Sequence, residues 1–240
     1  MKIVFRSLLA SGLMFVISVA SAAESPFSAN VALTSDYVFR GISQTNEEPA
    51  IQGGFDFSHS SGFYAGVWGS NVDFSDGDEA QLELDLYAGF SGSFAKNFGW
   101  DIGVINYGYP GAASSRNYDF TEVYGKLSYD FGPVNAKLSI NQTSDFFGAS
   151  GSATYIAIDV GIPLPGEFNL AIHGGKQDID DNGAFGTPDY TDYKIGVSKE
   201  FGGFGFALDW VDTDLDKAEC FSPGTDLCES RVVFTISKSM

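Results

Sequence analysis

Residues 81–91, QLELDLYAGFS, alternate between apolar and polar side chains. A period of two places successive side chains on opposite faces of a β-strand, whereas an amphipathic helix repeats every three to four residues. Residues 134–141, VNAKLSIN, alternate in the same way. Because such segments recur and no helical stripe of useful length appears, the sequence predicts an all-β protein. In 81–91 the apolar face is Leu82, Leu84, Leu86, Ala88 and Phe90, opposite Gln81, Glu83, Asp85, Tyr87 and Ser91.

The connections between the expected strands alternate in length along the whole chain. Short connections such as 131–133 and 201–203 take turns with long ones such as 109–117 and 213–229. An even number of strands with short turns at one end and long loops at the other is typical of an up-and-down antiparallel transmembrane β-barrel. A soluble Greek-key sandwich gives no reason for such regular alternation. About twelve strands are expected, near residues 28–41, 50–59, 63–72, 80–91, 99–108, 118–130, 134–142, 152–162, 167–175, 190–200, 204–212 and 230–240.

The N-terminus has the form of a secretory signal peptide. Lys2 and Arg6 precede an apolar run at 8–20, and Ala20-Ser21-Ala22 supplies a small-residue cleavage signal. An uncleaved anchor is the alternative, but the run is shorter than the roughly 20 apolar residues that a spanning helix needs. We therefore expect residues 1–22 to be a signal peptide and residues 23–240 to form one outer-membrane barrel domain.

The net charge of the chain limits the classes of partner that it can be expected to bind. Without Lys2 and Arg6, the 13 basic residues become 11 against 31 acids, and the formal net charge of −18 becomes −20. Such an excess of acids argues against a nucleic-acid partner. No phosphate loop, dinucleotide fingerprint or zinc spacing appears, so no cofactor is expected. The expected partners are outer-membrane lipid and small solutes, and the acidic loops are candidates for divalent cations at the cell surface.

The stretch TSDYVFRGISQT at 34–45 places an acid and an arginine at the end of the first expected strand. If this strand runs to residue 41, residues 29, 31, 33, 37 and 39 face lipid, while Asp36 and Arg40 face the lumen. An arginine among so many carboxylates is expected to be paired. The motif then serves either as a structural network across a narrow lumen or as a charged constriction. The predicted lumen-lining residues are Asp36, Arg40, Glu83, Asp85 and Glu122.

This motif, with LELDLYAGF at 82–90, INYGYPG at 105–111 and YDFTEVYG at 118–125, resembles the proteobacterial TorF-type porin family. The similarity spans essentially the whole mature chain, and its most specific part is the first motif. The resemblance implies an outer-membrane barrel with a pore function. The C-terminus departs from the usual barrel ending, since Met240 stands where an aromatic residue is common, and this puts assembly efficiency in question.

Two further motifs have structural and chemical interpretations. Cys220 and Cys228 lie close together, and in an exported chain they favour one local disulfide over a metal site. Residues 178–189 partly match a calcium-binding loop, with Asp178, Asp180 and Asn182 as candidate ligands, but Asp189 replaces the bidentate Glu. Whether this loop binds calcium stays open, and no metal site is predicted from the sequence.

Catalysis is the weaker class of function. Only His59 and His173 are available as bases, and no nucleophile can be paired with either, although His173 lies within plausible reach of Asp192. No catalytic residues and no enzyme activity are therefore predicted. The expected function is an outer-membrane porin that passes small neutral or cationic solutes through an acidic lumen. The alternative is a closed barrel whose acidic loops bind ligand or divalent cations without transport.

Overall fold

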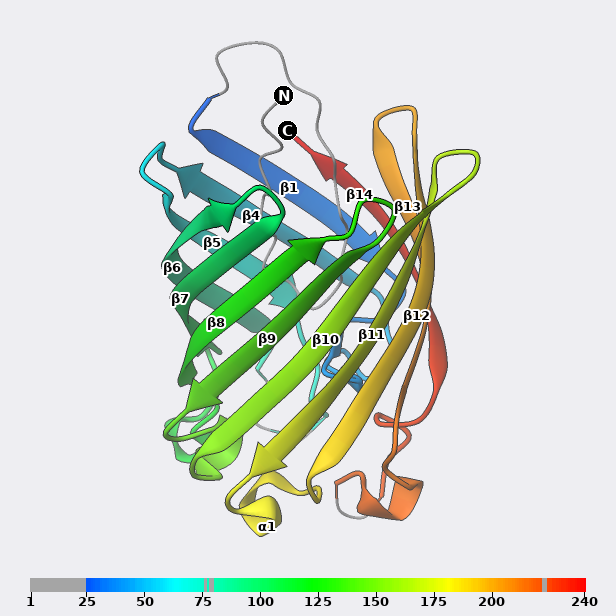
Figure 1. Cartoon of the computed structure of the whole chain (residues 1–240). Helices are drawn as coiled ribbons and strands as arrows, with labels where there is room; N and C mark the ends of the chain where they lie inside the picture. Colours follow the sequence, from blue (N-terminus) through cyan, green and yellow to red (C-terminus); the bar gives the residue numbers. More distant parts are fainter. Residues whose placement is uncertain (1–24, 76, 78–79, 222–223) are drawn as a thin grey trace.

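The computed structural model describes residues 25–75, 77, 80–221 and 224–240, and most of them form a closed antiparallel β-barrel (Figure 1). Twelve of the described strands make the wall, with each strand beside its neighbours in chain order and β14 closing the ring against β1. The prediction of an all-β, up-and-down barrel of about twelve strands is confirmed. The wall strands are β1 (Phe27–Thr34), β4 (Ala50–Ser58), β5 (Phe63–Asn71), β6 (Leu82–Ala95), β7 (Phe98–Gly108), β8 (Phe120–Asp130), β9 (Asn135–Thr143), β10 (Ala153–Leu164), β11 (Phe168–Ile179), β12 (Tyr190–Phe201), β13 (Phe204–Thr213) and β14 (Arg231–Ser239).

The remaining described elements are short. Strands β2 (Val38–Phe39) and β3 (Ile42–Ser43) form a separate two-stranded sheet. The helical pieces are η1 (Ser114–Arg116), η2 (Phe147–Ala149), α1 (Asn182–Phe185) and η3 (Lys217–Glu219). None of the helices in the described part of the chain is long and apolar enough to cross a membrane. The predicted signal peptide, residues 1–22, lies outside the described residues.

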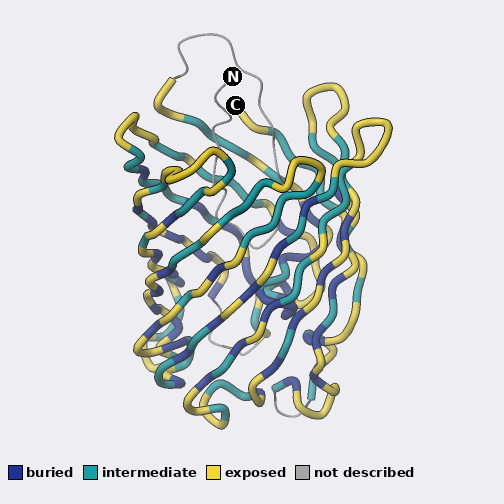
Figure 2. The backbone as a smooth tube through the Cα atoms, in the orientation of Figure 1, coloured by how far each residue is buried: buried dark blue, intermediate teal, exposed yellow. Residues whose placement is uncertain are grey.

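The alternation of side chains along each strand separates an apolar outside from a polar inside. On β6, Leu84 and Leu86 are exposed, while Glu83 and Asp85 are buried inside the barrel. Buried and exposed residues alternate along the wall strands (Figure 2). Large apolar side chains such as Ile158 and Leu208 are exposed on other strands in the same way. An apolar outer face over paired strands is what a bilayer requires, because lipid cannot satisfy free backbone groups.

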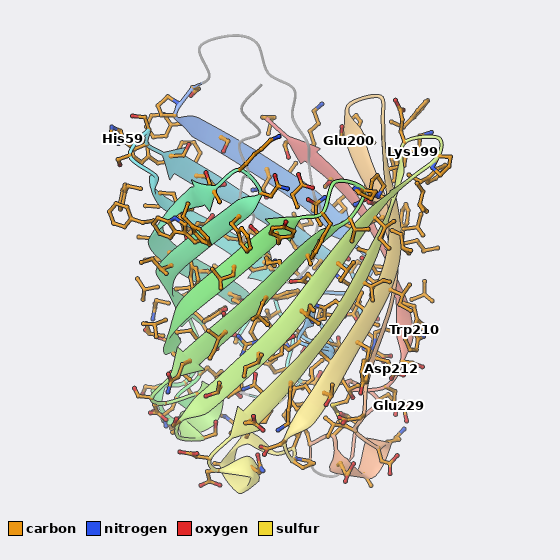
Figure 3. The ribbon with its side chains drawn as sticks, viewed as in Figure 1. His59, Lys199, Glu200, Trp210, Asp212 and Glu229 are labelled. Atoms are coloured by element: carbon orange, nitrogen blue, oxygen red, sulfur yellow. A yellow bond between two sulfur atoms is a disulfide. The ribbon has the colours of Figure 1, made fainter. Side chains whose placement is uncertain are left out.

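Short turns and long loops lie at opposite ends of the barrel. The short turns gather at the end where the C-terminus lies, and the long loops gather at the end that carries α1 (Figure 1). His59, Lys199 and Glu200 mark the short-turn end, and Glu229 lies toward the long-loop end (Figure 3). The described parts of the long loops therefore surround one mouth of the barrel.

The first wall strand is shorter than the sequence predicts. Strand β1 ends at Thr34, and residues 35–49, here called the inserted segment, leave the wall and fold into the barrel. The expectation that Tyr37 and Phe39 face lipid is wrong: Tyr37 is 5% exposed and Phe39 packs against the buried aromatic cluster. The alternation of apolar residues continues past Thr34 because this hairpin is itself a pair of short strands, so periodicity alone does not reveal where the chain leaves the wall.

A two-residue turn at Arg40 and Gly41 forms the tip of the inserted segment. Strands β2 and β3 pair Val38 with Ser43 and Phe39 with Ile42, so Arg40 and Gly41 are the two central turn residues. Their φ angles are 47° and 82°, and a type I′ hairpin turn needs positive φ at both positions. Gly41 meets this requirement without strain, whereas Arg40 adopts it at a cost that its contacts must offset.

The disulfide predicted between Cys220 and Cys228 is present and buttresses the inserted segment. Both cysteines are fully buried and pack in one cluster with Ile42, Tyr190 and Leu215. The backbone N–H of Ser43 donates to the carbonyl of Leu227 at 2.9 Å. The disulfide loop therefore holds the returning strand of the hairpin from the long-loop side.

Candidate functional site

Arg40, at the tip of the inserted segment, forms contacts with the opposite wall of the barrel. Its Nη2 donates to Oε2 of Glu122 on β8 and its Nη1 donates to Oε1 of Gln177 on β11, each at 2.7 Å. Its guanidinium lies over the ring of Tyr155 on β10, 4.2 Å from the centroid. The expected carboxylate partner of Arg40 is therefore Glu122, and the guanidinium bridges strands β8, β10 and β11.

Asp36 does not pair with Arg40, although four residues separate them in the sequence. Its Oδ1 accepts hydrogen bonds from the hydroxyls of Ser43 at 2.7 Å and Thr45 at 2.9 Å, both within the inserted segment. Its Oδ2 lies 3.0 Å from Nη1 of Arg231 at the start of β14. Asp36 thus fixes the base of the hairpin to the last wall strand, while Arg40 fixes its tip elsewhere.

The acids of β6 face the inserted segment from the other side. The hydroxyl of Tyr37 donates to Oε1 of Glu83 at 2.9 Å. Asp85, two residues along the same face, is 5% exposed, and its Oδ1 has no hydrogen-bond partner among the described residues. Asp85 is paired in register with Trp68 on β5 and with Tyr107 on β7, so two aromatic residues flank it.

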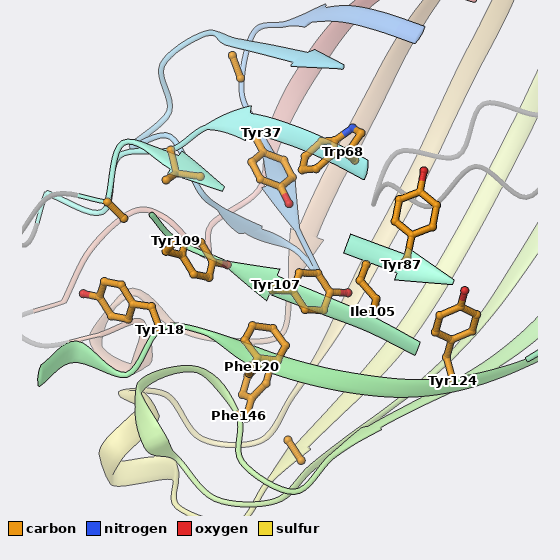
Figure 4. Close-up of a cluster of buried hydrophobic side chains, with 14 of the residues drawn as sticks. Tyr37, Trp68, Tyr87, Ile105, Tyr107, Tyr109, Tyr118, Phe120, Tyr124 and Phe146 are labelled. Carbon is orange, nitrogen blue, oxygen red and sulfur yellow. The ribbon is translucent and has the colours of Figure 1, made fainter. Parts of the chain in front are cut away.

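Aromatic side chains fill the interior toward the long-loop mouth (Figure 4). Tyr37 meets Trp68 edge to face with ring centroids 5.3 Å apart, and Tyr107 stacks on Phe120 at 4.4 Å. Phe74, on the loop after β5, packs against rings of the same cluster. Such rings bury large apolar areas and order one another by edge and offset contacts. The buried cluster includes Tyr37, Trp68, Tyr87, Tyr107, Tyr109, Tyr118, Phe120, Tyr124 and Phe146.

A cavity of about 160 Å³ lies beside the inserted segment, inside the barrel. One side of its lining consists of Asp85 with the neighbouring rings of Trp68 and Tyr107. The other side is made of charged groups of both signs on strands β8 to β12, among them Lys126 and Lys137. The cavity therefore presents an acidic and aromatic wall to a wall of mixed charge.

The cations of the mixed wall are held by acids of neighbouring strands. Nζ of Lys137 lies 3.1 Å from Oδ2 of Asp159, and Nζ of Lys126 lies 3.7 Å from Oδ2 of Asp101. Lys126 also lies over the ring of Tyr124, 4.2 Å from its centroid. These ion pairs cross between adjacent strands and leave the lysines neutralised in place.

His173 is part of the same network rather than a free base. Its Nδ1 lies 2.6 Å from Oδ1 of Asp159, and its Nε2 lies 2.9 Å from Oδ2 of Asp192. Tyr155 donates to the other oxygen of Asp192 at 2.7 Å. The expected proximity of His173 and Asp192 is therefore seen. With both ring nitrogens engaged, neither is available to activate a hydroxyl nucleophile.

The acids of the partly calcium-like loop serve other contacts. Oδ1 of Asp178 lies 2.5 Å from Nζ of Lys176, Asp181 caps α1, and Asp189 accepts from the backbone N–H of Ile179 at 2.9 Å. Within the described ranges, no group of three or more His, Cys, Asp or Glu side chains is placed to hold a metal ion. Near the disulfide, a hydrogen bond from Lys217 to Asp226 raises the pKa of that lysine.

The five residues predicted to line the lumen are all buried, with exposures between 1% and 6%. The structure brings Arg40 and Glu122 together and places Glu83 and Asp85 on one face of β6, but it separates Asp36 from this group. Their role along a conducting path stays a prediction. The interior position of Tyr37 and the hydrogen bond between Gln177 and Arg40 were not expected from the sequence. Gly41 directly after Arg40 was the available signal for a turn at that point.

Residues 19–240 match the Gcw_chp family model, which is described as a bacterial protein of unknown function. No curated protein sequence matches the chain. Among solved structures, the chain is similar to a KdgM porin with a TM-score of 0.61 at 6% identity, covering 89% of this chain and 99% of that chain. It is also similar to a NanC porin with a TM-score of 0.56 at 11% identity, covering 88% and 97%. At these identities the likeness concerns the fold. The chain belongs to the Gcw_chp family, and the resemblance to TorF-type porins stays a prediction.

Proposed function

We propose that this chain, as a member of the Gcw_chp family, is an outer-membrane porin that passes small neutral or cationic solutes. The observation that carries the proposal is the closed barrel, with apolar side chains outside and a buried, mainly acidic lining inside. The inserted segment lies across the proposed path, since it joins β6 on one side of the barrel to β11 on the other.

The preference for neutral or cationic solutes follows from the buried charges. The charges of the interior acids are only partly neutralised. Arg40, Lys126 and Lys137 each lie beside an acid. In contrast, Oδ1 of Asp85 has no hydrogen-bond partner among the described residues. A ring of carboxylates in a narrow pore attracts cations and repels anions. The buried acids are Asp36, Glu83, Asp85, Asp101, Glu122, Asp159 and Asp192, and the buried bases are Arg40 and Lys194.

Location in the bacterial outer membrane is part of the proposal. An even-stranded barrel with an apolar outer face and with short turns at one end is the architecture of bacterial outer-membrane proteins. The two solved structures named above are both described as porins. Membrane fractionation and heat-modifiable gel mobility test this location, and recovery of the folded protein in the soluble periplasmic fraction would overturn it.

Planar-bilayer conductance across a salt gradient tests the pore. Single-channel steps with a reversal potential of cation-selective sign are expected, because the unpaired interior charge is negative. An anion-selective current, or no current from protein shown to be folded, contradicts the proposal. Conductance with a series of sized neutral solutes then gives the width of the path.

A closed barrel that binds ligand without transport is the second candidate. The packing of the inserted segment favours it, since Tyr37, Arg40 and Ile42 each contact a different part of the surrounding structure. Uptake of small solutes into proteoliposomes separates the two candidates. A tight barrel excludes even the smallest solute, whereas a porin admits solutes up to a sharp size limit. Calcium titration of the same protein tests whether the acidic loops bind divalent cations.

A further inference from the structure

We propose that Asp85, with the rings of Trp68 and Tyr107 and of Tyr37 on the inserted segment, forms a binding site for a small organic cation of the alkylammonium class. All four residues line the cavity of about 160 Å³. The proposed site identifies a class of solute for the proposed porin. Binding of the cation does not depend on the porin function, but transport of the bound cation does.

The Asp85 carboxylate is buried and incompletely hydrogen-bonded. It is 5% exposed, and its Oδ1 has no hydrogen-bond partner among the described residues, although it borders the cavity. Buried carboxylates are otherwise paired or hydrogen-bonded, because removal from water is costly. A cation in the cavity would compensate the charge of this carboxylate electrostatically, and this does not require an N–H group.

Aromatic residues surround the Asp85 carboxylate. Register pairing places Trp68 on one side of Asp85 and Tyr107 on the other. Tyr37 packs edge to face on Trp68 at 5.3 Å, and its hydroxyl is fixed by Glu83. Ring faces attract cations, and quaternary ammonium ions are recognised by several rings arranged about one charge.

The charged groups of the cavity favour a cation over an anion as the ligand. The cationic groups of the cavity already have partners: Arg40 has Glu122, Lys126 has Asp101, and Lys137 has Asp159. Lys194 interacts electrostatically with Asp209. An anion entering the cavity would have to displace one of these acids, whereas a cation at Asp85 displaces nothing.

The chemistry and the size of the cavity favour an organic cation over a metal ion as the ligand. Calcium needs about six or more oxygen ligands, and the described residues include no metal-binding group of three or more His, Cys, Asp or Glu. The wall around Asp85 consists of aromatic rings, which suit an ion with an apolar surface. A cavity of about 150 Å³ binds a molecule the size of benzene, so the available space suits a small alkylammonium ion.

Isothermal titration of the folded full-length barrel in detergent tests the site, with choline as the probe and 3,3-dimethyl-1-butanol as its uncharged isostere. Choline is expected to bind at least about tenfold more tightly than the isostere, since only choline carries the charge. Asp85→Asn keeps the shape and removes the charge, so it is expected to weaken choline binding at least about tenfold and leave the isostere unchanged. Asp56→Asn is the matched control, because Asp56 is a partly buried acid on β4 that accepts a hydrogen bond from Tyr87, and neither residue lines the cavity. This variant is expected to bind choline like the parent.

Trp68→Phe and Trp68→Leu provide a second pair that does not depend on Asp85. The phenylalanine variant keeps a ring face and is expected to retain choline binding, while the leucine variant is expected to lose it. Heat-modifiable mobility confirms that each variant is folded. Equal binding of choline and the isostere, unchanged choline binding by Asp85→Asn, or no choline binding by the folded parent each overturns the site. Because the titration needs no transport, a failed conductance experiment and a failed binding experiment are distinguishable.

Discussion

Arg40 and Glu122 form an ion pair of 2.7 Å between the tip of an inserted hairpin and the barrel wall, and their side chains are only 4% and 1% exposed. The pair joins the inserted segment, which follows β1, to strand β8 of the wall. Gln177 holds the second arm of the same guanidinium. Charge-assisted hydrogen bonds of this kind hold a group in one geometry. Arg40 therefore anchors the inserted segment inside the barrel.

Replacing Arg40 by Ala is expected to loosen the inserted segment and to destabilise the protein by about 3 kcal/mol, because Glu122 is left buried without its partner. Single-channel conductance is expected to rise and to become more cation-selective. Bilayer recordings and denaturant unfolding of the same preparation measure the two effects.

Lys126→Ala is the matched control for this change. It removes another cation of the same cavity, but one that belongs to the wall and lies 3.7 Å from its acid. Its conductance is expected to stay close to that of the parent. If Arg40→Ala lowers stability and leaves conductance unchanged, Arg40 belongs to a fixed network away from any conducting path.

Replacing Gly41 by Ala is expected to dislodge the hairpin tip. The added Cβ would lie 2.4 Å from Cγ2 of Thr213 and 2.8 Å from Cβ of Asp192. Gly132, with φ of 95° and nothing within 4 Å of the corresponding Cβ, carries the same backbone penalty without a collision. We expect Gly132→Ala to cost about 1 kcal/mol and Gly41→Ala clearly more. Similar unfolding free energies for the two variants would contradict the placement of the tip.

Removing the disulfide by replacing Cys220 and Cys228 with Ser is expected to free the inserted segment locally. For a loop closed over a sequence separation of 8, the chain-entropy description gives about 2.5 kcal/mol. The amide of Ser43, which donates to Leu227, is expected to exchange its hydrogen faster, while amides of the wall strands stay protected. Hydrogen exchange followed by mass spectrometry measures this. Unchanged exchange at Ser43 would show that the loop does not hold the hairpin.

Placing an arginine on the outer face tests the membrane orientation of the barrel. Ile158 is 53% exposed in the middle of β10, and Ile158→Arg is expected to cost about 2–4 kcal/mol in lipid if that position lies near the midplane. Gln142→Arg, on the outer face near the long-loop end of β9, is expected to cost no more than about 1 kcal/mol. Equal costs measured in lipid vesicles would argue against a bilayer around this face.

The barrel could be predicted from the sequence because its wall obeys one local rule. Leu84 and Leu86 face outward and Glu83 and Asp85 face inward with a period of two, and this alternation is typical of the strands of a transmembrane barrel. The even strand count and the alternation of short and long connections then follow from the up-and-down order. These features need no knowledge of contacts between distant residues.

The interior could be predicted only as a set of polar residues. Asp36 and Arg40 look like members of one strand because the apolar alternation continues through Val38 and Phe39, yet the chain has turned inward by then. Which acid would meet Arg40 depends on how far the hairpin reaches across the barrel. That reach depends on where the hairpin turns, which is at Arg40 and Gly41, and the periodicity of the sequence does not indicate this position.

The contacts of the inserted segment also set an order of events in assembly. Arg40 and Gln177 are 137 residues apart in the chain, and Asp36 and Arg231 are 195 apart. Contacts between residues so far apart form only after the intervening chain has been organised. The hairpin emerges early but acquires its last partners when β14 completes the ring. The hairpin is therefore fully fixed only late in biogenesis, and in a barrel arrested before closure its base would lack the contact between Asp36 and Arg231.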